Sequence, residues 1–344
     1  MKIGIVTVYK SHNCGSFLQA YALKKTLIGM KHDVYFVPYY MFANSFLDVA
    51  FQCFKSLLKH RFRLVRFLLF RYIVFRQAIC KNFQRCSLKM NCDVFVFGSD
   101  TLWNFADPFF FQRKKFFLGL WTKKRKVAFS VSVGSSRYSD FLQDDCIENG
   151  LKNFSCISVR DDFSFDFVKK LSKREDVIET IDPTMLLRPE DYSFGKKIPF
   201  KKRFIFIYHF GNISKDLANE LKTYASSKGI RIVNMGSPNK FADENVVNDP
   251  FRFVQYIEQA DCVLTNTFHG CIFSILFNKR FVTDGFSKKK IETLLAKFGL
   301  VDRALYSDKD FMKKIDMSID YDVVNKHIEG YRKKSIDFLE RSLV

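Results

Sequence analysis

The sequence lacks the features that mark several classes of protein. No stretch of about 20 apolar residues is free of charged side chains, so we expect no transmembrane helix. The apolar run within Met1–Val6 is too short for a signal peptide and predicts a first strand instead. The nine cysteines include no CxxC pair and no histidine–cysteine cluster at zinc-ligand spacing. They therefore favour reduced, mostly buried cytosolic thiols over a disulfide framework or a zinc site.

Acidic residues are scarce relative to basic ones. Subtracting 36 Asp and Glu from 56 Lys and Arg leaves a net charge of +20. Such an excess favours an anionic partner: a nucleic acid, an anionic lipid or a phosphorylated substrate. Zinc-finger, RNA-recognition and helix-turn-helix signatures are missing, so we expect no nucleic-acid partner. With 344 residues, 47% of them hydrophobic, the chain is long enough for two globular domains of about 150 residues each.

Short apolar runs alternate with helical patterns along the chain, as is typical of parallel, doubly wound sheets. The expected strands are Ile3–Val8, Val34–Val37, Asp93–Phe97, Lys126–Val133, Cys156–Val159, Phe204–Tyr208, Ile230–Asn234 and Cys262–Leu264. The expected helices include Phe17–Ile28, Asp216–Ser226, Pro250–Gln259 and Phe268–Phe277, with more from about Lys309 and Tyr321. Residues 188–202 show no periodicity and are rich in Pro and Lys, which indicates a linker. We therefore predict two α/β domains, residues 1–187 and 203–344, with a cleft between them.

A strongly basic segment interrupts the first of these domains, at about residues 42–90. Phe42–Met90 contains ten Lys or Arg and a single acidic residue, Asp48. Between Phe51 and Phe83, apolar patches alternate with arginines, which predicts one or two amphipathic helices with a cationic rim. Such helices can lie on an anionic membrane surface, which would make this cytoplasmic protein peripheral to the inner face of the cytoplasmic membrane. The alternative is a helical insertion that packs on the domain and extends its arginines into solvent.

The stretch Ala260–Val282 carries the clearest candidate site. A predicted buried strand ends there at Leu264, and a predicted helix begins at Phe268. His269 and Gly270 occupy the first turn of that helix, where free backbone N–H groups and the helix dipole favour anions. Because ligands gather at the carboxyl ends of strands in open α/β sheets, His269 is placed to contact an anionic substrate. The alternative is a histidine that only satisfies the corner between strand and helix.

Other predicted strands also end in polar residues. These residues are Asn13, Gly15, Ser99, Asp100, Asn104 and Arg160. Asp100 directly follows a buried strand and is a candidate to accept a proton from a bound hydroxyl, or alternatively to cap the next helix. Arg160 offers the bidentate donor geometry that suits phosphate or carboxylate, or alternatively forms a local ion pair with Asp161. We expect Asp161 to cap the helix that follows.

Several motifs in a fixed order resemble the polysaccharide pyruvyl transferase family. They are IGIVTVYKSHNCGSFLQAYAL at Ile3–Leu23, FGSDTLWN at Phe97–Asn104, SVRDD at Ser158–Asp162, DPTMLL at Asp182–Leu187 and ADCVLTNTFHGCIFSILFNKRFV at Ala260–Val282. The resemblance implies two Rossmann-like domains facing across a cleft, as in GT-B glycosyltransferases. It also implies transfer of pyruvyl from phosphoenolpyruvate onto two hydroxyls of a sugar, forming a ketal. The acceptor would be a bacterial surface or capsular polysaccharide or its lipid-linked precursor.

The resemblance also implies roles for individual residues. His269 matches the family histidine at the phosphoenolpyruvate site, and Arg160 matches an arginine that contacts the same ligand. We expect His269 to act as the acid, because histidine ordinarily titrates nearest neutrality, and Asp100 to act as the base. The further substrate-binding candidates are Thr267, Gly270, Asn13, Gly15, Ser99, Asn104 and Lys279. Some family members have arginine in place of Thr267, so we expect either that the missing charge comes from Lys279 or Arg280 or that the donor is bound differently.

No metal or other cofactor is expected for this chemistry, with phosphoenolpyruvate as the donor substrate. One alternative is a GT-B glycosyltransferase that uses a nucleotide sugar, although the sequence offers no obvious acidic pair for the nucleotide ribose. A second alternative is a non-catalytic cationic module that docks an envelope-assembly complex to the membrane. That alternative leaves the polar clusters at the separate strand ends unexplained.

Overall fold

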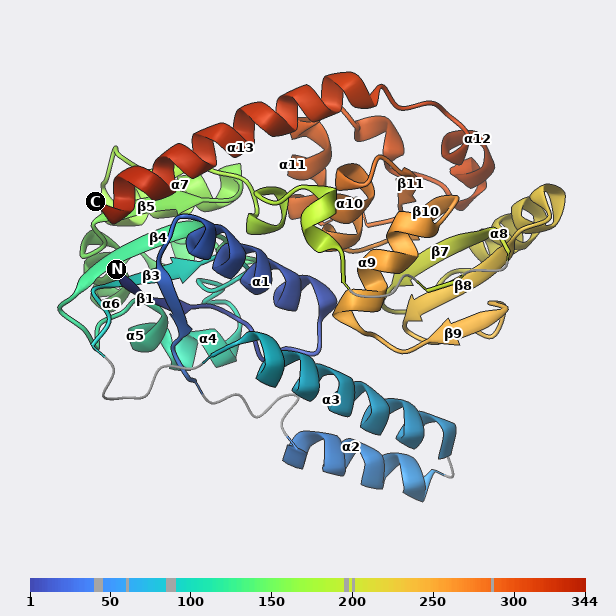
Figure 1. Cartoon of the computed structure of the whole chain (residues 1–344), viewed down its shortest axis with the longest axis horizontal. Coiled ribbons are helices and arrows are strands. Elements are labelled where there is room, and N and C mark those ends of the chain that lie inside the picture. Colours follow the sequence, from blue (N-terminus) through green and yellow to red (C-terminus); the bar gives the residue numbers. More distant parts are fainter. Residues whose placement is uncertain (40–45, 60–61, 85–90, 195–197, 200–201, 286–287) are drawn as a thin grey trace.

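The computed structural model contains two parallel β-sheets surrounded by helices (Figure 1). The structure describes residues 1–39, 46–59, 62–84, 91–194, 198–199, 202–285 and 288–344. Nearly all of the expected strands and helices are present within a few residues of their predicted bounds. The sequence patterns did not predict three of the strands, β6 (Ile178–Glu179), β9 (Glu244–Val246) and β11 (Arg280–Thr283).

The first sheet has six parallel strands in the order β2-β1-β3-β4-β5-β6. Their bounds are β1 (Lys2–Val6), β2 (Asp33–Phe36), β3 (Val94–Gly98), β4 (Arg125–Val131), β5 (Cys156–Val159) and β6 (Ile178–Glu179). Strand order reverses between β1 and β3, so the carboxyl ends of these strands border the crevice where open α/β sheets bind ligands.

The second sheet has five parallel strands in the order β11-β10-β7-β8-β9. Their bounds are β7 (Phe204–His209), β8 (Arg231–Gly236), β9 (Glu244–Val246), β10 (Cys262–Thr265) and β11 (Arg280–Thr283). Here the order reverses between β7 and β10. Each sheet therefore has its own switch point, and the candidate residues follow strands at or near these two points.

Helices cover both faces of each sheet, which explains why the central strands, such as β3 and β7, are buried along their whole length. Val94 and Val96 of β3 face a cluster that includes residues of α1 and α13, whereas Phe95 and Phe97 face residues of α6 and α7. The main-body helices are α1 (Cys14–Gly29), α4 (Pro108–Gln112), α5 (Lys114–Phe117), α6 (Asp145–Lys152), α7 (Asp162–Ser172), α8 (Lys215–Lys228), α9 (Pro250–Gln259), α10 (Phe268–Leu276), α11 (Lys289–Lys297), α12 (Phe311–Ile315) and α13 (Tyr321–Leu343). Helix α1 begins at Cys14 rather than at the predicted Phe17, because Asn13 caps it.

Helix α13 ties the two halves together. It starts beside the second sheet and runs back across the first, so the C-terminus lies near the N-terminus (Figure 1). Arg332 Nε donates to the carbonyl of Met185 at 2.8 Å, and the hydroxyl of Ser335 accepts from the Ile181 amide at 3.0 Å. This helix belongs to the predicted second domain by sequence but contacts the first, and the domain boundaries themselves stay a prediction.

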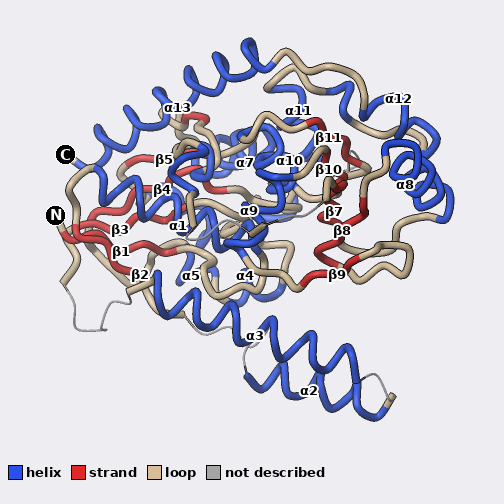
Figure 2. The backbone as a smooth tube through the Cα atoms, turned by 45° about the vertical axis from the view of Figure 1, so that its right-hand side comes forward, coloured by secondary structure: helices blue, strands red, loops and turns tan. Residues whose placement is uncertain are grey.

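The basic segment forms a hairpin of two helices, α2 (Phe46–Leu58) and α3 (Phe62–Asn82), that projects from the body (Figures 1 and 2). The prediction of amphipathic helices over Phe51–Phe83 is therefore confirmed. The ends of the predicted insertion, residues 40–45 and 85–90, lie outside the described residues. Of the helices that the structure describes, none is long and apolar enough to cross a membrane.

Candidate active site

A polar pocket of about 190 Å³ lies between the two halves, at the carboxyl ends of the strands of both sheets. Its lining comprises Asn13, Ser16, Asp100, Arg160, Tyr208, Phe210, Asn266, Thr267, Phe268, His269, Lys288 and Lys290. The structure thus brings together, in one cavity, candidate residues that the sequence placed at four separate strand ends: Asn13, Asp100, Arg160, Thr267 and His269. What each residue does there stays a prediction.

Two helices begin at this pocket, one from each half. The side chain of Asn13 caps α1, where its Oδ1 accepts from the Gly15 amide at 2.8 Å. The hydroxyl of Thr267 caps α10 in the same way, accepting from the Gly270 amide at 2.9 Å. Both helices therefore direct the positive ends of their dipoles toward the cavity, which favours an anionic ligand.

The two helix starts touch each other at Gly15 and His269. A Cβ atom added at Gly15 would lie 2.1 Å from His269 Nδ1, far inside any contact distance. Glycine at this position therefore makes room for the imidazole. Gly270 has a different reason to be glycine, because a Cβ atom there would lie 2.1 Å from the hydroxyl of Thr265.

Behind the pocket, the carboxylate of Asp182 contacts Arg160, Ser99 and His269. Asp182 was not among the predicted site residues. Its Oδ2 accepts from Arg160 Nη1 at 2.8 Å and from the Ser99 hydroxyl at 3.3 Å, and lies 3.5 Å from His269 Nε2. The other oxygen accepts from the Thr184 hydroxyl at 2.6 Å. Burial alone would raise the pKa of Asp182, but His269, Arg160 and the Thr184 hydroxyl together hold that pKa well below its usual range. Asp182 is therefore ionised and fixes two of the predicted site residues.

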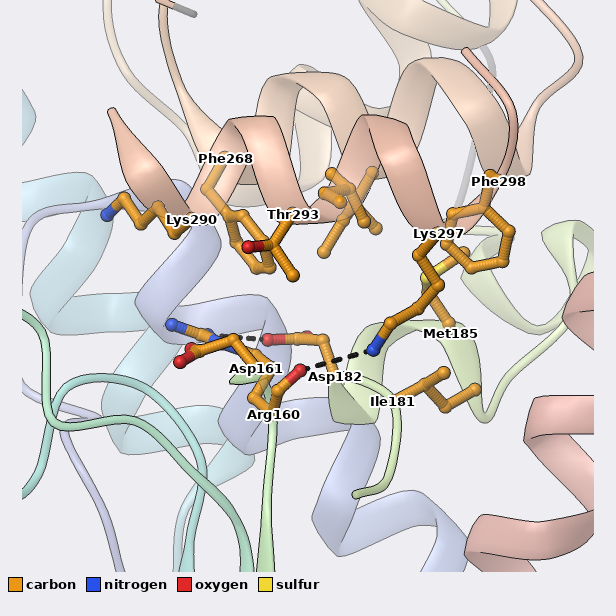
Figure 3. A pocket seen from close by; sticks show the side chains of 12 residues that line it. Arg160, Asp161, Ile181, Asp182, Met185, Phe268, Lys290, Thr293, Lys297 and Phe298 are labelled. Carbon is orange, nitrogen blue, oxygen red and sulfur yellow. Dashed lines mark hydrogen bonds and ion pairs between the residues drawn. The ribbon is translucent and has the colours of Figure 1, made fainter. Parts of the chain in front are cut away.

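Arg160 is held between this carboxylate and an aromatic ring. Its guanidinium carbon lies 4.3 Å from the centroid of the Phe268 ring, and only 4% of the residue is exposed (Figure 3). The alternative ion pair between Arg160 and Asp161 does not form; Asp161 caps α7, as expected, accepting from the Ser164 amide at 2.8 Å. Arg160 Nε is buried and has no hydrogen-bond partner in the described part of the chain.

Asp100 lies in a strained turn at the end of β3. Ser99 and Asp100 both have positive φ angles, 35° and 62°, in the region that L-residues avoid. Such strain often occurs at functional sites, where the surrounding structure holds it in place. One carboxylate oxygen of Asp100 accepts from the Ser16 hydroxyl at 2.6 Å and the other from the Thr101 amide at 2.9 Å. The turn is thereby fixed against the start of α1.

Two lysines of the pocket were not among the predicted site residues. Lys288 and Lys290 follow β11 at the start of α11, and Lys288 Nζ donates to the carbonyl of Asn266 at 2.6 Å. Burial lowers the pKa of Lys290, and the nearby positive charge of Arg160 lowers it further. The run of lysines at 288–290 looks like ordinary solvated surface in the sequence, and only its position just after a strand hinted at a site.

Three residues considered for substrate binding or donor charge lie elsewhere. Lys279 Nζ donates to the carbonyl of Ala260 at 3.1 Å, and Arg280 pairs with Asp316 at 2.8 Å. Both follow the far end of α10, whose nine residues separate them from its N-terminus by roughly 13 Å. Asn104 accepts from the Ser135 amide at 3.2 Å and joins two loops of the first half. The cations at the pocket are instead Arg160, Lys288 and Lys290.

Ser99, Gly15 and Gly270 support the pocket without lining it. Ser99 hydrogen-bonds Asp182, Gly15 packs on His269, and Gly270 completes the cap of α10. Within the described ranges, no group of three His, Cys, Asp or Glu side chains is placed to hold a metal ion.

Comparisons with known proteins agree with the motifs. The family model described as polysaccharide pyruvyl transferase matches residues 13–283, which contain all the pocket residues except Lys288 and Lys290. No curated protein matches the chain by sequence.

The structure is similar to enzymes of the GT-B fold. The UDP-GlcNAc 2-epimerase from Neisseria meningitidis, bound to UDP-GlcNAc, has a TM-score of 0.56 at 9% identity, with 99% of this chain and 100% of that chain covered. A putative UDP-N-acetylglucosamine 2-epimerase from Listeria monocytogenes has a TM-score of 0.56 at 8% identity, with 98% and 93% covered. At such low identity the likeness concerns the fold alone, and it confirms the predicted pair of Rossmann-like units facing across a cleft.

Proposed function

This chain belongs to the polysaccharide pyruvyl transferase family, and we propose that it transfers pyruvyl from phosphoenolpyruvate onto two hydroxyls of one sugar. The product is a pyruvate ketal on a surface or capsular polysaccharide or on its lipid-linked precursor. The observation that carries the proposal is that one pocket is lined by His269 and three cationic side chains and lies at two helix N-termini.

The charges of the pocket support an anionic donor. Phosphoenolpyruvate carries a carboxylate and a phosphate, and both need cationic or N–H partners. Arg160 offers a planar fork held by Asp182, and Lys288 and Lys290 offer point charges on the opposite half. The starts of α1 and α10 add free backbone N–H groups. These groups together replace the arginine that some family members have in place of Thr267.

The proposed reaction uses three proton transfers. His269 delivers a proton to the methylene carbon of phosphoenolpyruvate, which makes C2 electrophilic, and a sugar hydroxyl then attacks C2 while Asp100 accepts its proton. A second hydroxyl of the same sugar attacks C2 as the C2–O bond to phosphate breaks, its proton passes to the departing phosphate, and inorganic phosphate leaves. The sugar diol and phosphoenolpyruvate thus become the ketal and phosphate, with no oxidant or metal needed to balance the reaction.

Asp182 acts through its neighbours in this scheme. Its carboxylate is ionised and lies 3.5 Å from the His269 ring, where it can balance the charge of a protonated imidazole. The same carboxylate fixes the guanidinium of Arg160. We therefore assign Asp182 as a positioning residue for both the acid and the anion clamp.

The test is phosphate release from phosphoenolpyruvate by the purified protein, with a panel of free and lipid-linked glycans as acceptors. We expect phosphate to appear together with a glycan that has gained a pyruvyl group. Parallel reactions receive UDP-sugars in place of phosphoenolpyruvate. Glycan elongation from a UDP-sugar, without any turnover of phosphoenolpyruvate, would establish the glycosyltransferase alternative and overturn the proposal.

A further inference from the structure

The outer face of α2 carries a continuous apolar stripe. Four of its side chains are more than half exposed: Leu47 (62%), Phe51 (54%), Phe54 (59%) and Leu58 (67%). Their spacing places them on one side of the helix, opposite the buried Val49 and Cys53, which cluster with Leu68 of α3. We call these four residues the α2 stripe.

The stripe is more than scattered surface hydrophobicity. Single exposed apolar residues are normal, but a contiguous patch on a soluble surface marks an interaction site. Helix α3 exposes further large apolar side chains, among them Phe62 and Phe70, each more than half exposed. The hairpin stands away from the body in both views, with α2 as its outermost element (Figures 1 and 2). An extended flat surface can therefore reach the stripe.

The charge of the hairpin identifies the kind of surface. Residues 46–82 contain eight Lys or Arg and one acidic residue, Asp48. Lys55 lies 4.2 Å from the ring of Phe51, and Lys59 is exposed just past the stripe. A second copy of this face would bring like charges together, whereas a layer of anionic lipid headgroups complements the cations and accepts the apolar side chains. We propose that the α2–α3 hairpin docks on an anionic lipid bilayer through the α2 stripe and its lysines.

The root of the hairpin connects this surface to the pocket. Phe75 of α3 is fully buried in the core of the first half, and the His12 ring packs 5.3 Å from the Phe75 ring. His12 directly precedes Asn13, which caps α1 and lines the pocket. Docking the hairpin therefore holds the pocket at a fixed distance from the bilayer. Given the proposed function, this geometry assigns an acceptor glycan carried on a membrane lipid rather than a free one.

Vesicle sedimentation tests the docking directly. The full-length protein is mixed with vesicles of phosphatidylcholine alone or of phosphatidylcholine with phosphatidylglycerol. We expect it to sediment with the anionic vesicles at low salt and to be released as ionic strength rises past about 0.1 M, where charges beyond about 10 Å are screened. Equal recovery with neutral and anionic vesicles would overturn the proposal.

Matched variants locate the contact. F51E together with F54E should lower the fraction bound by about tenfold or more, whereas L142E, at a leucine that is 58% exposed outside the hairpin, should not. K55E with K59E should weaken binding similarly, and K123E with K124E, which make the same charge change elsewhere, should leave most of it. Melting curves confirm that each variant folds. Unchanged binding by both hairpin variants would overturn the proposal, as would a dimer of the wild-type protein that the stripe variant abolishes.

Turnover of a soluble and of a lipid-anchored glycan distinguishes docking of the hairpin from the proposed pyruvyl transfer. The F51E and F54E variant should turn over a water-soluble glycan at the wild-type rate but lose turnover of the same glycan on a lipid anchor in anionic vesicles. Equal loss with both acceptors would show that the hairpin acts inside the pocket rather than at a bilayer. If phosphoenolpyruvate is turned over with neither acceptor, the proposed function fails, while the sedimentation results still decide whether the hairpin docks.

Discussion

The two helices that begin at the pocket, α1 and α10, are built alike and contribute differently. Each follows a strand at a switch point, and each is capped by a polar side chain, Asn13 or Thr267. Helix α1 then presents Gly15, which has no side chain, and α10 presents the imidazole of His269. Gly15 of α1 thus leaves room for the His269 imidazole of α10. The contact between these two residues joins the two halves of the molecule.

The same division extends to the charges. The carboxylates, Asp100 and Asp182, come from the first half, whereas Lys288 and Lys290 come from the second. Arg160 is the cation of the first half, and Asp182 holds it against Phe268 of the second. We therefore expect the donor to lie mainly against the second half and the acceptor hydroxyls to approach from the side of Asp100.

Replacing the chemical group should have the largest effect. H269Q keeps a hydrogen-bond donor of similar reach but cannot deliver a proton. We expect kcat to fall by roughly 10²–10⁴, the usual scale for losing a general acid, while calorimetry shows phosphoenolpyruvate binding within about tenfold of wild type. H327Q, at an exposed histidine of α13, is the control. Turnover by H269Q within a few-fold of wild type would mean that His269 has no part in proton transfer and, like Gly15 on α1, only packs at the start of its helix.

Filling the space should have the next largest effect. G15A places a methyl group 2.1 Å from His269 Nδ1, so the imidazole must move. A displacement of about 1 Å can cost about 10²-fold in rate, and we expect a loss in kcat of that order. The control on the same helix is G29A, whose added Cβ meets nothing within 4 Å. G29A should keep full activity; if G15A does as well, the contact between the two helix starts is not required.

Changing the clamp of the first half should have a smaller effect. In R160K the charge is kept but the planar fork between Asp182 and Phe268 is lost. We expect KM for phosphoenolpyruvate to rise by about tenfold, in line with the loss of one charged hydrogen bond, with a modest drop in melting temperature because the pair is buried. R188K, at an exposed arginine, should change neither. A large loss of stability with a normal KM would mean that Arg160 is purely structural.

Removing one charge from the second half should have the smallest effect. K290Q should raise the Kd for phosphoenolpyruvate several-fold, whereas K289Q, at the exposed neighbour that pairs with Glu292, should not. Because the pKa of Lys290 is lowered, wild-type binding should weaken as pH rises, beginning below the ordinary lysine pKa of about 10.4. K290R should move this weakening to higher pH. Identical pH profiles for wild type and K290R would remove Lys290 from the donor site.

Much of this arrangement could be predicted from the sequence, since apolar periodicity marks strands and the carboxyl ends of parallel strands converge. The same reasoning predicts that Asn13, Asp100 and His269 each follow the carboxyl end of a strand, where open α/β sheets bind ligands. It could not find Asp182, whose hydrogen bonds to Arg160 and Ser99 depend on tertiary packing. The prediction of Lys279 as a donor contact rested on its closeness to His269 in sequence, although the predicted helix Phe268–Phe277 already separates the two residues.

In the proposed reaction, His269 protonates the methylene carbon of phosphoenolpyruvate in the shared pocket. The most direct measurement is the mass of the product formed in D2O, where the exchangeable protons of His269 are replaced by deuterium. We expect one deuterium in the methyl group of each pyruvate ketal made by the wild-type protein, and a collapse in the rate at which H269Q makes that product. A ketal methyl group without deuterium, or undiminished labelled product from H269Q, would contradict it.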